Sequence, residues 1–206
     1  MATGIINPYA IEHGPTYEDE CLADNPVGLW MMDETSGTTI VNQGSSGTAG
    51  NGSYPSLYSP VLAGDTLFGL TTPEFQAKSD HVLVTYPAGY TPDAGSTGAA
   101  TWEFLFRLDS MTSITYMFPL QPGPPYKPFY AYVRSSAELT VMVISQAGSL
   151  VMNAITAYGL IVAGTEYHCV VTFNRAASRM EIWLNGVSVA VSTYVGASSG
   201  AGPITQ

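Results

Sequence analysis

The sequence predicts an all-β protein, an antiparallel sandwich of two sheets with a jelly-roll strand order and extended N- and C-terminal arms. Hydrophobic residues make up 46% of the 206 residues and charged residues only 11%, so the chain can bury a sizeable core. Roughly twelve or thirteen short segments alternate apolar and polar residues, with Gly, Pro, Asn and Ser between them. No segment has the apolar period of a long helix.

The first 25 residues predict an extended arm. Glycine and proline recur through residues 1–15, which interrupts any regular element. Residues 17–24 (YEDECLAD) predict one short helical turn, because acidic residues lie at its start, where the helix dipole favours them. We expect the apolar side chains of the arm to contact a partner. These residues are Ile5, Ile6, Tyr9 and Ile11.

Residues 26–193 are predicted to form a single sandwich domain whose strands follow the alternation along the chain. A glycine-rich loop at 42–52 is expected to carry little structure of its own. The segment 101–109 alternates most regularly and predicts a central core strand, with 113–118 as its hairpin partner. The other predicted strands are 27–33, 38–41, 67–74, 80–86, 129–134, 138–145 and 149–154.

The strongest local signal lies between residues 166 and 191. Residues 166–174 and 179–183 both alternate, and the pair Asn185-Gly186 follows the second segment. An Asn-Gly pair between β-formers predicts a type I′ hairpin turn, since both central residues of that turn need a positive φ. A last strand is expected after the turn. Residues 194–206 then form a Gly/Ser-rich C-terminal tail with almost nothing to bury.

Charge and cysteine content exclude several classes of protein. Six basic residues against sixteen acidic ones give a net charge of −10, which argues against nucleic acid or an anionic membrane as a partner. Cys21 and Cys169 are too few for a disulfide framework; we expect Cys169 in the core, and a bridge between the two is the less favoured alternative. The start of the chain lacks the pattern of a signal peptide. The sequence also has no apolar run of about twenty residues, so we expect no membrane-spanning helix.

Two segments resemble a known family. The segment EYHCVVTFNRAASRMEIWLNGVSVA is similar to the signature W-x-H-V-x-V-T-x-D … L-Y-V-N-G of laminin-G-like, concanavalin-A-like jelly rolls, and TWEFLFRL is similar to the core strand that precedes it. The segment TYEDECLADNPVGLWMMDETSGTTIVNQGSSGTAGNGSY resembles the lead-in found before such domains in virion proteins of tailed bacteriophages. The matched segments extend from Tyr17 to Val191.

The sequence departs from this pattern at a position relevant to metal binding. Asn42 stands where an Asp is common, which weakens any calcium site implied by relatives that bind the ion through acidic loops. We therefore expect no cofactor, with calcium as an alternative that no motif supports. Single carboxylates that could each supply one calcium ligand, or more simply act as turn and cap residues, are Asp33, Asp65 and Asp80.

We expect no enzyme activity. Glycoside hydrolases on this fold resemble one another in a strand with the motif E-x-D-x-x-E, because the reaction needs two carboxylates about 5 Å apart. Here Glu18, Asp19 and Glu20 have the wrong spacing, and Glu103 stands alone on its strand. No G-x-S-x-G motif stands between a predicted strand and a predicted helix, as a nucleophile elbow requires; the match GASSG at 196–200 lies in the Gly/Ser-rich tail. The three histidines, which lack a paired spacing for zinc, are His13, His81 and His168.

The proline-rich segment 119–128 and the aromatic residues at its end predict a contact surface. The prolines exclude a central strand and favour an extended, projecting loop. Exposed tyrosine rings there could stack on a sugar or anchor a protein interface, and the third alternative is a loop that packs on its own sheet. The candidate contact residues are Tyr126, Lys127, Phe129 and Tyr130.

The resemblance implies a structural virion protein of a tailed bacteriophage. The expected role is that of a capsid decoration or minor capsid protein, which binds the major capsid protein or other virion proteins through its arms and forms a homo-oligomer within the particle. The alternative is a glycan-binding, lectin-like module of a tail or head appendage that aids adsorption to host or surface glycans. Both place the chain in the virion, assembled in the host cytoplasm.

Overall fold

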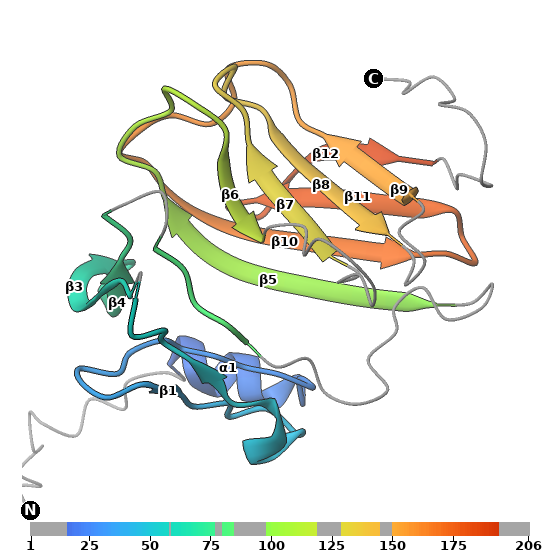
Figure 1. Cartoon of the computed structure of the whole chain (residues 1–206). Coiled ribbons are helices and arrows are strands. Elements are labelled where there is room, and N and C mark those ends of the chain that lie inside the picture. Colours follow the sequence, from blue (N-terminus) through green and yellow to red (C-terminus); the bar gives the residue numbers. More distant parts are fainter. Residues whose placement is uncertain are drawn as a thin grey trace, which may run out of the picture. The chain divides into compact units, whose positions relative to one another are not determined.

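All strand pairs whose register is described in the computed structural model are antiparallel, which confirms the prediction of an all-β protein. The structure describes residues 16–57, 59–76, 80–84, 98–118, 129–144 and 150–193. Within these ranges the only α-helix is α1 (Tyr17–Ala23), and Figure 1 shows it together with the strands.

The contacts divide the chain into two units. Unit 1 comprises Met1–Thr66 and Leu70–Ala88, and unit 2 comprises Leu67–Gly69 and Gly89–Gln206. The single domain predicted for 26–193 stays a prediction, and each unit is described by itself below.

Unit 2 contains two four-stranded sheets (Figure 1). The first has the order β12-β11-β10-β5 and the second the order β6-β7-β8-β9. The strands of the first sheet are β5 (Ala99–Arg107), β10 (Glu166–Asn174), β11 (Arg179–Leu184) and β12 (Val187–Ser192). The strands of the second are β6 (Thr115–Phe118), β7 (Phe129–Val133), β8 (Leu139–Ile144) and β9 (Leu150–Ile155).

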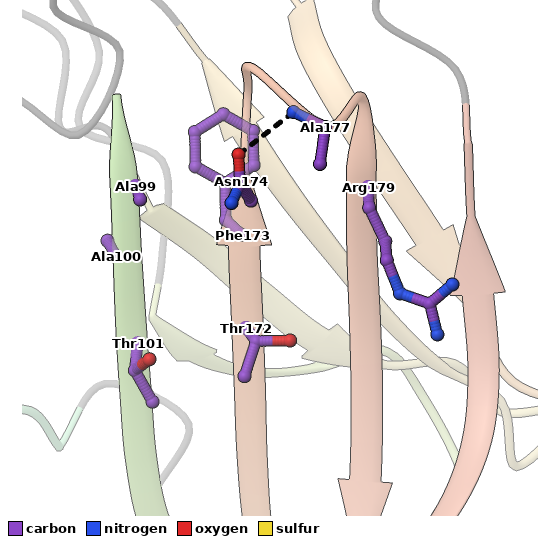
Figure 2. Close-up of a pocket in the computed structure, with 8 residues that line it drawn as sticks. All are labelled: Ala99, Ala100, Thr101, Thr172, Phe173, Asn174, Ala177 and Arg179. Carbon is purple, nitrogen blue, oxygen red and sulfur yellow. Dashed lines mark hydrogen bonds between the residues drawn. The ribbon is translucent and has the colours of Figure 1, made fainter. Parts of the chain in front are cut away.

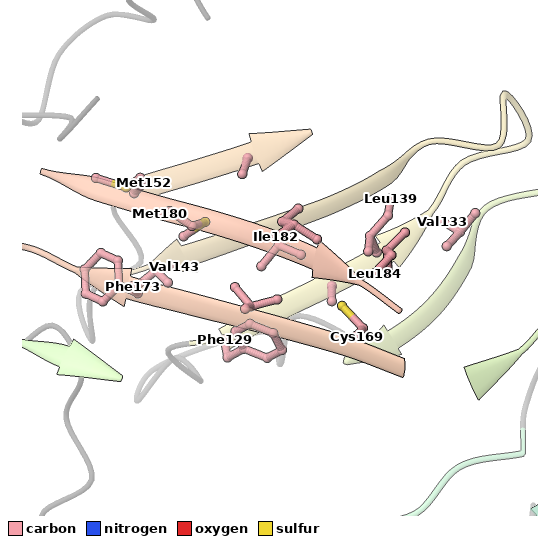
Figure 3. Close-up of a cluster of buried hydrophobic side chains, with 14 of the residues drawn as sticks. Phe129, Val133, Leu139, Val143, Met152, Cys169, Phe173, Met180, Ile182 and Leu184 are labelled. Atoms are coloured by element: carbon pink, nitrogen blue, oxygen red, sulfur yellow. The ribbon is translucent and has the colours of Figure 1, made fainter. Parts of the chain in front are cut away.

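The two sheets pack against each other over one hydrophobic core, part of which Figure 3 shows. Strand β10 alternates as the sequence predicts, so that Tyr167, Cys169, Val171 and Phe173 are all buried. Across the sandwich, the Trp102 ring of β5 stacks on the Phe129 ring of β7, with ring centroids 4.2 Å apart. Such contacts between sheets, rather than hydrogen bonds, hold the two layers together.

The predicted hairpin of 101–109 with 113–118 is wrong, although both segments are strands. Strand β5 pairs with β10, and β6 pairs with β7 in the other sheet. The chain therefore changes sheets between the two segments. Leu108 and Met111, on this connection, pack against the core, and their burial explains why the chain crosses over instead of turning back.

The predicted Asn-Gly turn is confirmed. Asn185 has φ 49° and Gly186 has φ 78°, the pair of positive values that a type I′ turn requires. The Asn185 side chain also fixes the turn, because its Oδ1 accepts a hydrogen bond from the His168 backbone N–H at 2.8 Å. The local sequence was sufficient here because the turn depends on two residues alone.

Unit 1 begins with the predicted helical turn. Helix α1 starts with a capping box in which the Asp19 N–H donates to Thr16 Oγ1 and the Thr16 N–H donates to an Asp19 carboxylate oxygen. Its strands are β1 (Thr39–Ile40), β2 (Gly52–Ser53), β3 (Val61–Leu67, ending in unit 2) and β4 (Leu70–Glu74). Strand β1 lies within predicted segment 38–41 and β4 within 67–74, whereas β3 was not predicted.

Two predicted strands of unit 1 are absent from the described residues. In 27–33, Met32 has a positive φ of 55°, outside the usual β region, and the backbone of Leu29 forms hydrogen bonds with residues 42 and 43 instead of with a neighbouring strand. In 80–84, only Leu83 forms a bridge, to Ser53. Alternation alone therefore overestimates strand content where a loop supplies the hydrogen bonds.

The glycine-rich loop 42–52 is ordered around one side chain, contrary to our prediction. Asn42 is 5% exposed, and its Oδ1 accepts from the N–H groups of Leu29 and Gly44 at 2.8 and 3.2 Å. Its Nδ2 donates to Ser46 Oγ and to the Gly47 carbonyl oxygen, both at 2.8 Å. A short 3₁₀ helix, Gly47–Gly50, completes the loop.

Candidate functional site

The aromatic residues of β7 fall on two faces of the sheet because the strand has a period of two. Phe129, Ala131 and Val133 point into the core, whereas Tyr130 and Tyr132 point to the outer face. Tyr116 of β6 lies directly opposite Tyr132 in the antiparallel register. We call Tyr116, Tyr130 and Tyr132 the tyrosine cluster.

The three rings of the tyrosine cluster are in mutual contact. The ring centroids of Tyr130 and Tyr132 are 5.2 Å apart, and those of Tyr116 lie 5.9 Å from Tyr130 and 5.8 Å from Tyr132. All three pairs are tilted rather than stacked, a geometry that aromatic quadrupoles favour. Tyr116 is 51% exposed, so the cluster presents aromatic surface to solvent.

The hydroxyl groups of the cluster are also close together. Burial, followed by hydrogen bonding to Tyr116, raises the pKa of Tyr130 to about 12, further above the physiological range. Arg134 Nη2 donates to Tyr132 Oη at 3.3 Å, and the guanidinium carbon lies 5.8 Å from the centroid of the Tyr132 ring. A Glu138 carboxylate oxygen lies 3.9 Å from Arg134 Nη1 and offsets the positive charge.

Of the two candidate contact residues that the structure describes, one lies in this cluster. Tyr130 belongs to it. Phe129 is 1% exposed and stacked on Trp102, so its side chain is part of the core and forms no surface. Tyr126 and Lys127 lie outside the described residues, as do the arm residues Ile5, Ile6, Tyr9 and Ile11.

Sequence reasoning missed Tyr116 and Tyr132. The signal for Tyr132 was present in FYAYV, where the period of two separates Tyr130 and Tyr132 from Phe129. Tyr116 could not be assigned to the same face, because its partner strand was wrongly predicted to be 101–109.

The outer face beside the cluster also carries an unsatisfied hydroxyl. Thr140 lies opposite Tyr132 in the β7–β8 register and is 1% exposed. Its Oγ1 has no hydrogen-bond partner within the described structure. Leaving such a group buried costs free energy, whereas the hydroxyl of nearby Thr156 accepts a hydrogen bond from the Leu139 N–H at 2.9 Å.

A pair of polar side chains lies on the outer face of the sheet β12-β11-β10-β5. His168 Nε2 is 2.8 Å from a Glu103 carboxylate oxygen. Both side chains are about one-third exposed. The pair joins β5 to β10 diagonally across the register, and a structural role for His168 agrees with this contact.

A shallow pocket of about 540 Å³ opens at one end of β5 and β10 (Figure 2). Ala99, Ala100 and Thr101 line it from β5, and Thr172, Phe173 and Asn174 line it from β10. Asn174 Oδ1 accepts a hydrogen bond from the Ala177 N–H at 2.9 Å, so this side chain stabilises the loop to β11. The lining consists mainly of methyl and hydroxyl groups, and Arg179 is already bound to Glu181 at 2.8 Å.

Two of the carboxylates considered as calcium ligands accept hydrogen bonds from nearby backbone N–H groups, Asp65 within strand β3 and Asp80 outside any strand. Asp65 Oδ1 accepts from the Thr66 N–H at 2.7 Å, and Asp80 Oδ2 accepts from the Gln76 N–H at 3.0 Å. Within the described residues, no group of three or more His, Cys, Asp or Glu side chains comes together. The cysteines are both free, and burial raises the pKa of the Cys169 thiol to about 12.

The chain has no match among protein-family models, curated proteins or solved structures. Among the described helices, none has both the length and the apolar character needed to span a membrane. Fold and site together define an all-β protein with a two-sheet sandwich and a tyrosine cluster on one outer face.

Proposed function

We propose that this chain is a structural protein of a tailed-bacteriophage virion, a capsid decoration or minor capsid protein that binds the major capsid protein through its arms. The finer fold assignment, a concanavalin-A-like jelly roll, belongs to the same proposal. Two antiparallel four-stranded sheets over a common core are compatible with that fold. The role is non-catalytic, and the chain is present in several copies per particle.

The observation that carries the proposal is the lead-in segment that resembles phage virion proteins. Its most characteristic residues have hydrogen-bonding roles. Glu34 accepts from the Val41 N–H and from the Tyr54 hydroxyl, both at 2.7 Å, and Trp30 Nε1 donates to the Gly50 carbonyl oxygen at 2.8 Å. The resemblance therefore covers residues that interact with one another, which favours a shared local fold over a chance match of composition.

Particle association tests this proposal. The full chain, a chain lacking residues 1–15 and a chain lacking residues 194–206 are each expressed during infection by the phage whose genome carries the gene. Purified particles are then separated on a density gradient and the chain is quantified by mass spectrometry. We expect the full chain in the particle fraction and a loss of at least about tenfold on removal of 1–15. An unchanged particle fraction would show that the N-terminal arm does not dock, and absence of the full chain from particles would refute the virion role.

The second candidate function is glycan binding by an appendage module. The specific observation in its favour is that Tyr130, a predicted contact residue, lies in a cluster of three tyrosines on an outer sheet face. Aromatic rings with hydroxyl groups at their edge suit sugars, which have apolar C–H faces and polar rims.

A further inference from the structure

The tyrosine cluster combines apolar faces with neutral polar edges. Tyr116 is half exposed, and its contacts with Tyr130 and Tyr132 at 5.9 and 5.8 Å hold its ring in place. A ring that is already ordered loses little rotamer freedom on binding, so contact with its face costs little entropy. The cluster is therefore a preorganised surface of aromatic carbon.

The phenol groups provide hydrogen bonds without charge. Tyr130 has a neutral hydroxyl that can donate and accept a hydrogen bond, as any tyrosine does at physiological pH. Burial and its hydrogen bond to Tyr116 raise its pKa further above that range. The Arg134 side chain orients the Tyr132 hydroxyl by donating to it. A pyranose ring has the matching chemistry, an apolar C–H face that stacks on the aromatic ring and equatorial hydroxyls that reach the phenols.

Charge selects among sugars. Arg134 contacts Tyr132 of the cluster, and Glu138 offsets its charge at 3.9 Å. The whole chain carries a net charge of −10, which repels polyanions at long range. The net negative charge of the chain would therefore repel an acidic polysaccharide, and the positive charge of Arg134 is already paired with Glu138.

From these observations we infer that Tyr116, Tyr130 and Tyr132 bind neutral hexopyranose units of a polysaccharide, with the Tyr116 ring as the stacking surface. The inference rests on the second proposed function, glycan binding, and names its site and its ligand class.

Affinity electrophoresis of the full chain in native gels tests the inference. Gels contain one neutral polysaccharide each (dextran, mannan or galactan) or one acidic polysaccharide (polygalacturonate or hyaluronate) at pH 7. We expect at least one neutral polysaccharide to retard the chain. The retardation should change little between low salt and about 0.5 M NaCl, a concentration that screens surface charges strongly, because no ion pair is involved.

Three variants locate the site. We expect Tyr116→Ala to weaken the affinity about tenfold because the stacking ring is lost, and Tyr116→Phe to weaken it only about threefold because the ring remains. Tyr158→Ala is the matched control: Tyr158 is 80% exposed but lies on the loop between β9 and β10, and its removal should leave the affinity unchanged. If Tyr116→Ala loses its cooperative urea transition, Tyr132→Phe replaces it, with an expected loss of about threefold.

The outcomes separate the two levels of the hypothesis. Binding to a neutral polysaccharide that Tyr116→Ala, or Tyr132→Phe in its place, leaves unchanged would keep glycan binding and refute the tyrosine cluster as its site. Binding to the acidic polysaccharides alone would refute the neutral ligand class. No retardation by any of the five polysaccharides would refute both the cluster as a sugar site and glycan binding as a function, and the cluster would then be assigned to a protein interface.

Discussion

Neighbouring residues of β7 lie in different environments, one in the core and the next on the outer face, because of the geometry of a strand. Phe129 and Tyr130 were predicted together as contact residues because both follow a proline-rich segment. Successive side chains of a strand point to opposite faces, so Phe129 fills the core beside Trp102 and Tyr130 joins the outer cluster. The alternation of residues along the sequence therefore distinguishes Phe129 from Tyr130. The aromatic composition of the segment does not.

Two buried threonines of unit 2 differ in the hydrogen bonding of their hydroxyl groups and allow a prediction for single residues. Thr140 has an unsatisfied Oγ1, whereas Thr156 Oγ1 accepts from the Leu139 N–H. We expect Thr140→Val to raise the free energy of unfolding by about 1 kcal/mol, because it replaces an unsatisfied polar atom with a methyl group of similar size. Thr156→Val should lower it by about 1–3 kcal/mol, because it leaves the Leu139 N–H without its partner.

Urea denaturation of the two variants beside the parent chain measures both effects. The opposite signs make the pair its own control, since a general effect of valine in these strands would move both values in the same direction. A loss of stability in Thr140→Val would show that its hydroxyl has a partner.

At the scale of elements, what could be predicted from the sequence depends on how local the cause is. The Asn185-Gly186 turn and helix α1 were predicted, because each depends on a few adjacent residues. The pairing of β5 with β10 was not, since its partner lies some sixty residues away and burial against the second sheet decides it. The tyrosine cluster shares this difficulty, because it requires the correct β6–β7 pairing.

The loop 42–52 illustrates the same limit within unit 1. Its glycines suggested a loop without structure, but one of them is required by close packing: a Cβ on Gly44 would lie 2.8 Å from the backbone oxygens of Pro26 and Val27. The side chain of the organising residue, Asn42, accepts a hydrogen bond from Leu29, which lies outside the loop, and donates one to Gly47 within it. The bond to Leu29 joins residues thirteen positions apart, so no local sequence pattern predicts it.

Asn42 therefore carries a prediction for this element. We expect Asn42→Ala to expose the N–H groups of Leu29 and Gly44 to solvent and to raise their hydrogen-exchange rates by at least about tenfold, because both donate to its Oδ1. Asn42→Asp keeps that acceptor but turns a second oxygen toward the Gly47 carbonyl, so we expect unit 1 to be destabilised in this variant as well.

Gln43→Ala serves as the matched control. It removes a neighbouring amide side chain whose Oε1 is buried without a hydrogen-bond partner within the described structure, while the backbone bond from Gln43 to Leu29 remains. Exchange rates in Gln43→Ala should stay near those of the parent chain. Equal rates in Asn42→Ala and Gln43→Ala would contradict the central role of Asn42.

At the scale of the whole molecule, the two units differ in how much apolar surface they bury. The described hydrophobic residues that are buried in unit 1 are Ile40 and Tyr54, whereas the core cluster of unit 2 extends from Phe106 to Leu184. Burial of apolar side chains is the main favourable contribution to folding. Unit 2 therefore has a core of its own, and unit 1 depends on hydrogen bonds such as those of Asn42 and Glu34.

This difference predicts that residues 89–206 fold by themselves. We expect this fragment to show a β-type circular dichroism spectrum and a single cooperative urea transition, because it contains all residues of the core cluster. It lacks the hydrogen bond from the Phe68 N–H to Glu166, an exposed contact whose loss costs about 1 kcal/mol. Fragment 1–88 is the comparison. We expect it to show no cooperative urea transition, because it buries too little apolar surface to offset the conformational entropy lost on folding. A fragment 89–206 that aggregates or unfolds without cooperativity, while the full chain unfolds cooperatively, would show that the sandwich needs unit 1 to fold.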